Sequence, residues 1–394
     1  MPAFTFEQTH PWLLFERTSI RQLATDAWMN LGEAYSKMEH LAGVPLPPTV
    51  AKKLLNVFLA RGAVATTAIE GNTLTEAQAL DHLEGRLKLP ASLAYQEREI
   101  ANIISAFNRI KDEVMSGADI SLTQDRIKWM NAQVLDGLDV GEGVVPGHYR
   151  SDRRGVGRYA GPQPTELAHL MQRLCDWLPT IQPADPTDAR SSLVFAIIRA
   201  ALGHLYIAWI HPFGDGNGRT ARLIEVQMLL EAGCPTVAAQ LLSNHYNQTR
   251  PEYYKRLDQT SQPRESVLPF LEYAISGLVD QLRLQVDEVR NLVVGLAWNR
   301  YVHDRISDHS ATSARRRLLV LNMPRSNAVP RSELREISPE VREAYSGRGE
   351  KTLTRDLNAL IQLRLVERVE SGLKPTIDSI LAFRAQRSIA SLPR

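Results

Sequence analysis

The sequence predicts a mainly α-helical protein with a small β-hairpin and a C-terminal α+β domain. Most segments carry apolar residues at three- and four-residue steps, separated by short clusters of Pro, Gly, Asn and Asp. Residues 141–164 are instead rich in Gly, Pro and Arg with Tyr and Val between them, which favours a hairpin over a helix. After about residue 291 the pattern becomes three short helices followed by strand, turn and strand, which is the order of a winged-helix domain.

The composition is that of an ordinary globular protein. Of 394 residues, 44% are hydrophobic and 23% are charged, and the formal net charge is only +2. These values exclude a mainly disordered chain and a chain built as a whole to coat nucleic acid or membrane. Two cysteines, Cys175 and Cys234, cannot form a disulfide framework or a thiolate zinc site, so a reducing compartment is expected.

The sequence also gives expectations about location. The first residues show no basic segment followed by an apolar core and a cleavage site, so we expect a cytoplasmic protein without a secretory signal. The most apolar stretch, residues 193–210, contains Arg199 and His204. Because a membrane span would penalise both side chains, this stretch is expected to be a buried core helix.

The most informative segment begins where this core helix stops. Residues 211–222 read His-Pro-Phe-Gly-Asp-Gly-Asn-Gly-Arg-Thr-Ala-Arg, and helical periodicity returns directly after Gly218. A glycine-rich loop that leads into a helix N-terminus offers unpaired backbone N–H groups to an anion. Arg219 and Arg222 are three residues apart on the new helix, so both guanidinium groups can reach the same polyphosphate.

Two other side chains of this segment have chemistry to offer. Asp215 would be repelled by a phosphate unless a divalent cation joined them, and Mg²⁺ is the natural oxygen-ligated choice. His211 is suited to accept a proton from an incoming hydroxyl as a general base. Together they predict transfer of a phosphorus-containing group to a hydroxyl.

Other readings of the segment fit less well. A dinucleotide fingerprint needs a third glycine where Arg219 stands, and a Walker loop needs Gly-Lys-Ser/Thr. An EF-hand counted from Asp215 needs an acidic residue at Val226. The remaining alternative, a simple glycine-rich turn between two core helices, does not explain why His, Asp, Asn and two Arg accompany the glycines.

The segment matches the Fic family motif H-x-F-x-[D/E]-G-N-G-R-x-x-R at every fixed position, and residues 61–275 resemble that family more broadly. The resemblance implies a helical Fic core that transfers AMP from Mg-ATP to a Ser, Thr or Tyr hydroxyl of a target protein. It implies that His211 is the base and Asp215 the Mg²⁺ ligand. It also implies a nucleotide site formed by Phe213, Gly214, Gly216, Asn217, Gly218, Arg219 and Arg222, and a target-docking flap within residues 141–164.

A second match lies upstream of the motif. Residues 66–72, Thr-Thr-Ala-Ile-Glu-Gly-Asn, resemble the Fic inhibitory motif [S/T]-x-x-x-E-[G/N] through Thr66, Glu70 and Gly71. In that family the glutamate pairs with the second motif arginine, here Arg222, in the place of the γ-phosphate; a carboxylate can mimic phosphate in this way. The alternative is that Glu70 is simply a residue at a helix C-terminus before a Gly-Asn stop.

The resemblance divides the chain into three parts. Residues 1–115 are expected to form an N-terminal helical region with the inhibitory motif, residues 116–290 the Fic core, and residues 291–394 a linker helix and winged-helix domain. Tyr253 and Tyr254 match a family segment that walls the adenine pocket, although aromatic pairs are as often core residues. His204, seven residues before His211, is expected to be a hydrogen-bonded core histidine rather than a metal ligand.

Two segments depart from the family pattern. Residues 260–262, Thr-Ser-Gln, stand where some members carry an adenine-binding Asn, and residues 153–155, Arg-Arg-Gly, replace an apolar strand residue in the flap. The sequence therefore leaves the adenine contact open and indicates that target docking differs.

The C-terminal domain is more basic than the rest of the chain. Residues 311–394 contain 16 Lys and Arg against 9 Asp and Glu. Helices are expected at residues 313–321, 330–337 and 352–363. In the third helix Leu353, Leu357 and Leu360 should face the core, whereas four polar side chains should point outward: Lys351, Arg355, Asn358 and Gln362.

The expected function is that of an autoinhibited protein adenylyltransferase that uses Mg-ATP and also modifies itself. Two alternatives stay open: a DNA-binding winged-helix regulator whose Fic core senses nucleotide, and a related Fic activity such as removal of AMP or another phosphoryl-group transfer. The expected partners are ATP, an unidentified target protein and, through the winged helix, DNA. A homo-oligomer is also expected, although no residue pattern fixes its size.

Overall fold

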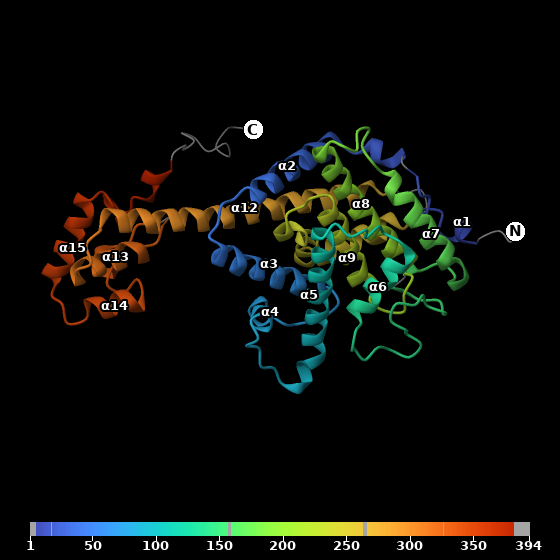
Figure 1. The fold of residues 1–394 in the computed structure, drawn as a ribbon, viewed down its shortest axis with the longest axis horizontal. Coiled ribbons are helices and arrows are strands. Elements are labelled where there is room, and N and C mark those ends of the chain that lie inside the picture. The colour runs from blue at the N-terminus through green and yellow to red at the C-terminus, as the bar shows by residue number, and fades with distance from the viewer. Residues whose placement is uncertain (1–4, 17, 157–158, 263–265, 326, 382–394) are drawn as a thin grey trace. The chain divides into compact units, whose positions relative to one another are not determined.

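The computed structural model describes residues 5–16, 18–156, 159–262, 266–325 and 327–381. They form two compact units, residues 1–287 and residues 288–394, and the long helix α12, Leu268–Arg305, contributes to both. The first unit contains the helices of the N-terminal region together with those around the glycine-rich loop (Figure 1). The N-terminal region is therefore not a separate body.

The first unit is built almost entirely of helices (Figure 1). Before the hairpin lie α1 Phe6–Thr9, α2 Thr25–Ala42, α3 Pro48–Ala68, α4 Glu76–Leu83, α5 Ala94–Met115 and α6 Gln124–Val134. After it lie α7 Leu167–Trp177, α8 Ala189–Ile210, α9 Asn217–Glu231, α10 Leu241–Gln248 and α11 Arg250–Thr260. The mainly helical prediction is confirmed.

The centre of this unit is the packed pair α8 and α9. Ala, Leu and Ile side chains cover every face of α8, so the helix has no polar stripe and is largely buried. By length and hydropathy this helix could cross a membrane. It is mostly buried within the unit, however, as expected for the core helix that Arg199 and His204 predict. Helices α3, α5 and α6 pack against α9 and bring the N-terminal region to the loop between α8 and α9.

The predicted flap contains a two-stranded antiparallel hairpin. Strands β1 Gly155–Val156 and β2 Tyr159–Ala160 pair in the register Gly155 with Ala160 and Val156 with Tyr159. Gly155 is required here, because a Cβ atom would lie 1.8 Å from the Tyr159 carbonyl oxygen. A single bridge between Tyr149 and Phe213 joins the stretch before the hairpin to the glycine-rich loop.

The second unit has its own apolar core, which includes Trp298, Leu319, Val341 and Leu360. Its elements are the end of α12, α13 Ala311–Asn322, α14 Pro339–Tyr345, α15 Glu350–Gln362, and the antiparallel strands β3 Val366–Val369 and β4 Gly372–Pro375. Val329 forms a further bridge to Leu373 of β4.

One helix of this unit is misplaced in the sequence prediction. Residues 331–333 form only a single 3₁₀ turn, and the second helix starts at Pro339 instead of Pro330. The Ser338 hydroxyl caps this helix by accepting from the Val341 N–H, and Pro339 occupies its first turn. The signal for this start is the dipeptide Ser338-Pro339.

In α15 the inward leucines Leu353, Leu357 and Leu360 are buried as predicted, and the four polar residues expected to point outward are exposed. The helix ends at Gln362, and Arg364 follows with a φ of 56°, a conformation that usually selects glycine.

Candidate active site

The loop between α8 and α9 is closed by its own asparagine. The Asn217 side chain accepts from the Phe213 N–H and donates to the Phe213 carbonyl, each at 2.9 Å. His211 ends α8 with a φ of 48°, and Gly216 precedes α9 with a φ of 76°. Both left-handed residues turn the chain so that the first N–H groups of α9 come directly after the loop.

Two buried polar side chains attach this loop to its surroundings. Asn131 of α6 donates to the Asp215 carbonyl at 2.9 Å and accepts from the Gly147 N–H at 2.9 Å. Arg150 donates to the backbone carbonyls of His211, Asp152 and Pro162 at 2.6 to 2.8 Å. The flap and the loop are thus held together by side chains that bind main-chain carbonyl and N–H groups.

The surroundings of His211 favour its neutral form. Burial, followed by the positive charge of Arg150, lowers the pKa of His211 from its usual 6.5 to about 4. The imidazole is therefore neutral at physiological pH and can accept a proton.

The predicted inhibitory glutamate lies on the second motif arginine. Glu70 follows α3, and its carboxylate accepts from Arg222 at 2.7 Å, while the same guanidinium donates to the Thr66 carbonyl at 2.9 Å. Gly71, with a φ of 104°, turns the chain away directly after Glu70. Burial alone would raise the pKa of Glu70, but the charge and hydrogen bond of Arg222 hold it below its usual value.

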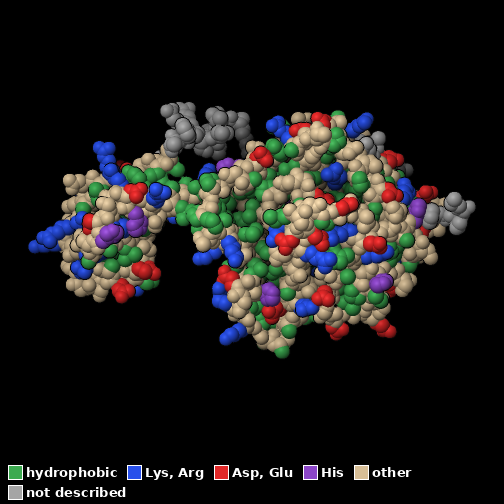
Figure 2. All heavy atoms as spheres, viewed as in Figure 1, with side chains coloured by type: hydrophobic (Ala, Val, Ile, Leu, Met, Phe, Trp, Pro, Cys, Tyr) green, Lys and Arg blue, Asp and Glu red, His purple; other side chains and the backbone are tan. Residues whose placement is uncertain are grey.

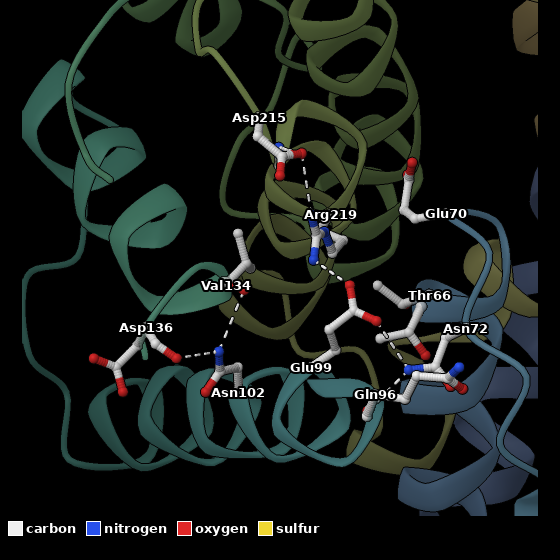
Figure 3. A network of polar contacts seen from close by, with 12 residues as sticks. Thr66, Glu70, Asn72, Gln96, Glu99, Asn102, Val134, Asp136, Asp215 and Arg219 are labelled. Atoms are coloured by element: carbon white, nitrogen blue, oxygen red, sulfur yellow. Dashed lines mark hydrogen bonds and ion pairs between the residues drawn. The ribbon is translucent and has the colours of Figure 1, made fainter. Parts of the chain in front are cut away.

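The first motif arginine has a different partner, Glu99 of α5. Arg219 donates to Glu99 at 2.5 Å and to Asp215 at 3.2 Å. The other Glu99 oxygen accepts from Asn72 at 3.0 Å, so one carboxylate joins Arg219 to the turn that follows Glu70 (Figure 3).

The surroundings of Gly218 fit a phosphate group. A Cβ atom at this position would lie 2.3 Å from a Glu70 oxygen and 3.1 Å from an Arg222 nitrogen, so only glycine leaves room for an anion on Arg222. Within the described part of the chain, Nε and Nη1 of the buried Arg222 have no hydrogen-bond partner. The Glu70 carboxylate occupies part of the space in which phosphate oxygens could accept hydrogen bonds from these two nitrogens.

A cavity of about 470 Å³ opens beside the loop. Of the predicted residues, Glu70, His211, Asn217, Gly218, Tyr253 and Tyr254 line it. Tyr253 is buried, whereas Tyr254 is 39% exposed and donates to the Ile69 carbonyl at 3.3 Å. The base, the glutamate and the two tyrosines therefore border one space.

His204 is a core histidine, as predicted. Its Nε2 lies 2.8 Å from the Tyr253 hydroxyl and its Nδ1 lies 3.0 Å from a Glu225 oxygen. The Glu225 carboxylate also accepts from Tyr246. This buried chain of polar groups fixes Tyr253 in the cavity wall.

The residues present suit a magnesium ion shared with a nucleotide better than one held by protein alone. Among the described residues no three His, Cys, Asp or Glu side chains come together as a metal site. Asp215 supplies a single carboxylate whose side chain is 42% exposed. Mg²⁺ in nucleotide sites is commonly bound by one or two carboxylates and the substrate phosphates, so Asp215 fits that role.

Not every predicted site residue borders the cavity. Phe213 is 1% exposed and packs its ring against Tyr149, so its part in the loop is structural. Gly214 lies against Val144, where a Cβ atom would approach to 3.0 Å. Thr66 contributes its carbonyl to Arg222, and Gly71 contributes its backbone conformation.

Two lining residues, Leu257 and Asp258 of α11, were not predicted. Ser261, in the segment where the adenine contact was left open, and Tyr159 of the predicted flap also line the cavity. Leu257 and Asp258 follow Tyr253 and Tyr254 by four residues, so helical spacing could have identified them. Glu99 and Arg150 carry no local signal, because their partners are distant in sequence.

The comparisons with known proteins cover the segment that contains this site. Residues 121–229 match the model of the Fic/DOC family, so this part of the chain is similar to a Fic domain. It is similar to a protein adenylyltransferase Fic of Nematostella vectensis, with 28% identity over 237 residues that cover 60% of this chain and 51% of the relative. A protein adenylyltransferase Fic of Drosophila melanogaster is 32% identical over 208 residues, which cover 53% of this chain and 38% of the relative. The chain thus spans about half or less of these relatives.

Solved structures support the fold. A Fic family protein from Desulfovibrio desulfuricans aligns with a TM-score of 0.54 and 21% identity, covering 88% of this chain and 93% of that one. A Fic-domain signaling protein from Bacteroides thetaiotaomicron aligns with a TM-score of 0.51 and 25% identity, covering 66% of this chain and 98% of that one. The helical architecture is therefore that of Fic proteins.

Proposed function

We propose that this protein is an autoinhibited protein adenylyltransferase, which transfers AMP from Mg-ATP to a hydroxyl side chain of a target protein. The observation that carries the proposal is the Glu70 carboxylate, bound to Arg222 over Gly218, in the same cavity as the neutral His211. The similarity to proteins named adenylyltransferases supports the same reaction.

In the proposed reaction, the Nε2 or Nδ1 atom of His211 accepts the proton of the target hydroxyl. The hydroxyl oxygen then forms a bond to the α-phosphorus of ATP, and the bond to the β-phosphate oxygen breaks, which releases pyrophosphate. Arg219, Arg222 and the N–H groups around Gly216 and Gly218 hold the phosphates, with Tyr253 and Tyr254 beside the base. Mg²⁺, bound through Asp215, would neutralise charge on the phosphate oxygens.

Inhibition follows from competition for Arg222. Glu70 supplies to this guanidinium the negative oxygen that a terminal phosphate would otherwise supply. As long as the pair is intact, ATP cannot place all its phosphates in the loop. Displacement of the Glu70 side chain would free Arg222 and restore the site.

The flap is proposed to position the target. Strands β1 and β2 offer main-chain groups for strand pairing with an extended target segment. Arg153 and Arg154 stand where the family pattern predicts an apolar residue. Arg154 is bound to the Asp152 carboxylate and to the carbonyls of Gly214 and Glu142, whereas the exposed Arg153 adds a positive charge that favours a target segment with acidic residues.

Intact-mass analysis tests the proposal. Wild type, Glu70→Gly and Glu70→Gly/His211→Ala are incubated with Mg-ATP, since we also propose that the protein modifies itself. We expect an AMP-sized addition in Glu70→Gly alone. A phosphate-sized addition would assign a different phosphoryl transfer, and no addition to Glu70→Gly or to proteins of a cell extract would contradict adenylyl transfer.

The second candidate function concerns residues 288–394, which we propose to be a winged-helix domain. Its third helix, α15, exposes Lys351, Arg355, Asn358 and Gln362, and Arg368 of β3 donates to Asn358. Figure 2 shows further Lys and Arg side chains on this unit, interspersed with Asp and Glu. Such a face could bind DNA or a protein; salt-dependent duplex binding that Arg355→Ala abolishes would favour DNA.

Location and assembly are proposals too. Both cysteines are buried and unpaired, which supports a reducing compartment such as the cytoplasm. A homo-oligomer is proposed as well, and sedimentation of the purified protein would test it.

A further inference from the structure

Arg219 lies between two carboxylates of very different exposure. Its Nη1 is 2.5 Å from Glu99, and its Nη2 is 3.2 Å from Asp215. The Glu99 side chain is 7% exposed and that of Asp215 is 42% exposed. The guanidinium is itself buried, so its shorter and more buried contact is the one with Glu99 (Figure 3).

Glu99 is held in position from its other side. Asn72 donates to the second Glu99 oxygen at 3.0 Å and to the Gln96 carbonyl at 2.9 Å, and its own amide oxygen accepts from the Leu74 N–H. Asn72 is 7% exposed. Because both Glu99 oxygens have partners and the side chain is 7% exposed, neither oxygen is free to turn toward solvent.

The arrangement has a consequence for Asp215. An arginine and a single carboxylate tend to form a bidentate pair, which uses both carboxylate oxygens. With one Arg219 nitrogen engaged by Glu99, only one oxygen of Asp215 contacts the guanidinium. The other oxygen of the Asp215 carboxylate, whose side chain is 42% exposed, is then available to a cation.

We infer that Glu99 is a positioning residue, which holds Arg219 so that the Asp215 carboxylate stays available to a magnesium-bound nucleotide. The inference rests on the proposed function, because it assigns Asp215 to the metal. Through Asn72 the same carboxylate is attached to the turn that carries Glu70, so the inhibitory turn contacts Arg222 directly and Arg219 through Glu99.

A purely structural role for Glu99 makes a different prediction. Loss of a buried ion pair would loosen the site and weaken every form of the nucleotide alike. If Glu99 keeps Asp215 available, its loss lets Arg219 take up Asp215, and only the metal-bound form is weakened. Metal-free ATP is bound through positively charged side chains and needs no carboxylate, so its affinity is unchanged or higher.

The test compares the dissociation constants of Mg-ATP and of ATP in EDTA by competition against a fluorescent ATP analogue. The parent is Glu70→Gly/His211→Ala, which is open to nucleotide and does not turn it over. Glu99→Gln is the test variant. Glu97→Gln, on the same helix but paired with His82, is the matched control.

We expect Glu99→Gln to reduce the preference for Mg-ATP over metal-free ATP by about tenfold, the size of one charge-assisted contact. Asn72→Ala, which removes one hydrogen bond from Glu99, should reduce this preference by about threefold. Because this change is milder, it keeps the test possible if Glu99→Gln does not fold. Glu97→Gln should leave the preference unchanged.

An unchanged preference in Glu99→Gln, or equal weakening of both forms, would overturn the inference. If the same variant series with His211 restored still transfers AMP, the proposed function survives that failure. A parent that binds neither form of ATP would contradict both.

Discussion

The two arginines of α9 are paired with carboxylates from two regions that differ in how firmly they hold them. Arg222 is bound by Glu70, whose side chain is 33% exposed, and Arg219 by Glu99, whose side chain is 7% exposed. Glu70 follows the last turn of α3 and precedes Gly71, which has a φ of 104°. Glu99 lies within the 22-residue helix α5.

The difference indicates that an arginine–carboxylate pair can either regulate nucleotide binding or support the structure of the site, depending on which element carries the carboxylate. A carboxylate at a helix end beside a cavity can leave when one turn unwinds, and water or phosphate can replace it. A carboxylate inside a packed helix can leave only if the helix itself moves. This difference is why we propose inhibition for Glu70 and positioning for Glu99.

The largest expected effect is on stability, and it separates the two pairs. Glu99→Ala removes the shortest and most buried ion pair of Arg219, and should lower the free energy of unfolding by about 3 kcal/mol. Glu70→Ala should lower it by about 1 kcal/mol or less, because Glu70 borders the cavity and water can replace it at Arg222. Urea unfolding of both variants measures the difference; equal losses would contradict the comparison.

The next effect is on transfer. Glu70→Gly should raise the rate of AMP transfer by about 100-fold, which corresponds to about 2.7 kcal/mol of relieved competition at Arg222. Glu76→Gln, just downstream and paired with Arg61, is a control that should leave the rate unchanged. Equal rates for Glu70→Gly and wild type would remove the inhibitory role.

A smaller effect is expected at Gly218. In the Glu70→Gly background, Gly218→Ala places a methyl group 3.1 Å from an Arg222 nitrogen, where a phosphate oxygen would bind. The affinity for Mg-ATP should fall about tenfold, as for the loss of one charge-assisted hydrogen bond. The control is Gly32→Ala, because Gly32 has open space around it and a normal backbone; this variant should bind Mg-ATP as the parent does. Gly233→Ala is unsuitable as a control because Gly233 has a φ of 87°.

The smallest effect is the response to pH. His211 must be neutral to accept a proton, and its pKa is about 4, so protonation removes activity only as the pH falls through about 4. Between pH 6 and 8 the rate of Glu70→Gly should change by less than about twofold on account of this residue. A rate that falls with a midpoint near pH 6.5 would show that His211 is not held neutral by its surroundings.

The sequence predicted much of the fold and the residues of the loop because these signals are local. Helical periodicity located α8, and the spacing of residues 211–222 placed the base, the cradle and both arginines on one segment. The glycines of this segment were informative for the same reason, because each is required by a backbone angle or by the close approach of a neighbouring atom. Glu70 was found through a short motif.

Partners from distant segments were not predictable. Glu99 is 120 residues from Arg219, and nothing beside it in the sequence indicates a buried carboxylate. Arg150 lies within the predicted flap segment, but its three carbonyl acceptors become visible only in the folded chain. The second helix of the C-terminal unit was misplaced because Pro330 and Ser338-Pro339 both resemble helix starts.

The central claim is that Glu70 stands where a terminal phosphate would bind Arg222. The most direct test measures the affinities of Mg-ATP and Mg-ADP for His211→Ala and for Glu70→Gly/His211→Ala, neither of which turns over. The competition predicts that removal of Glu70 strengthens Mg-ATP binding by at least about tenfold and changes Mg-ADP binding little. Equal strengthening of both nucleotides, or of neither, would contradict it.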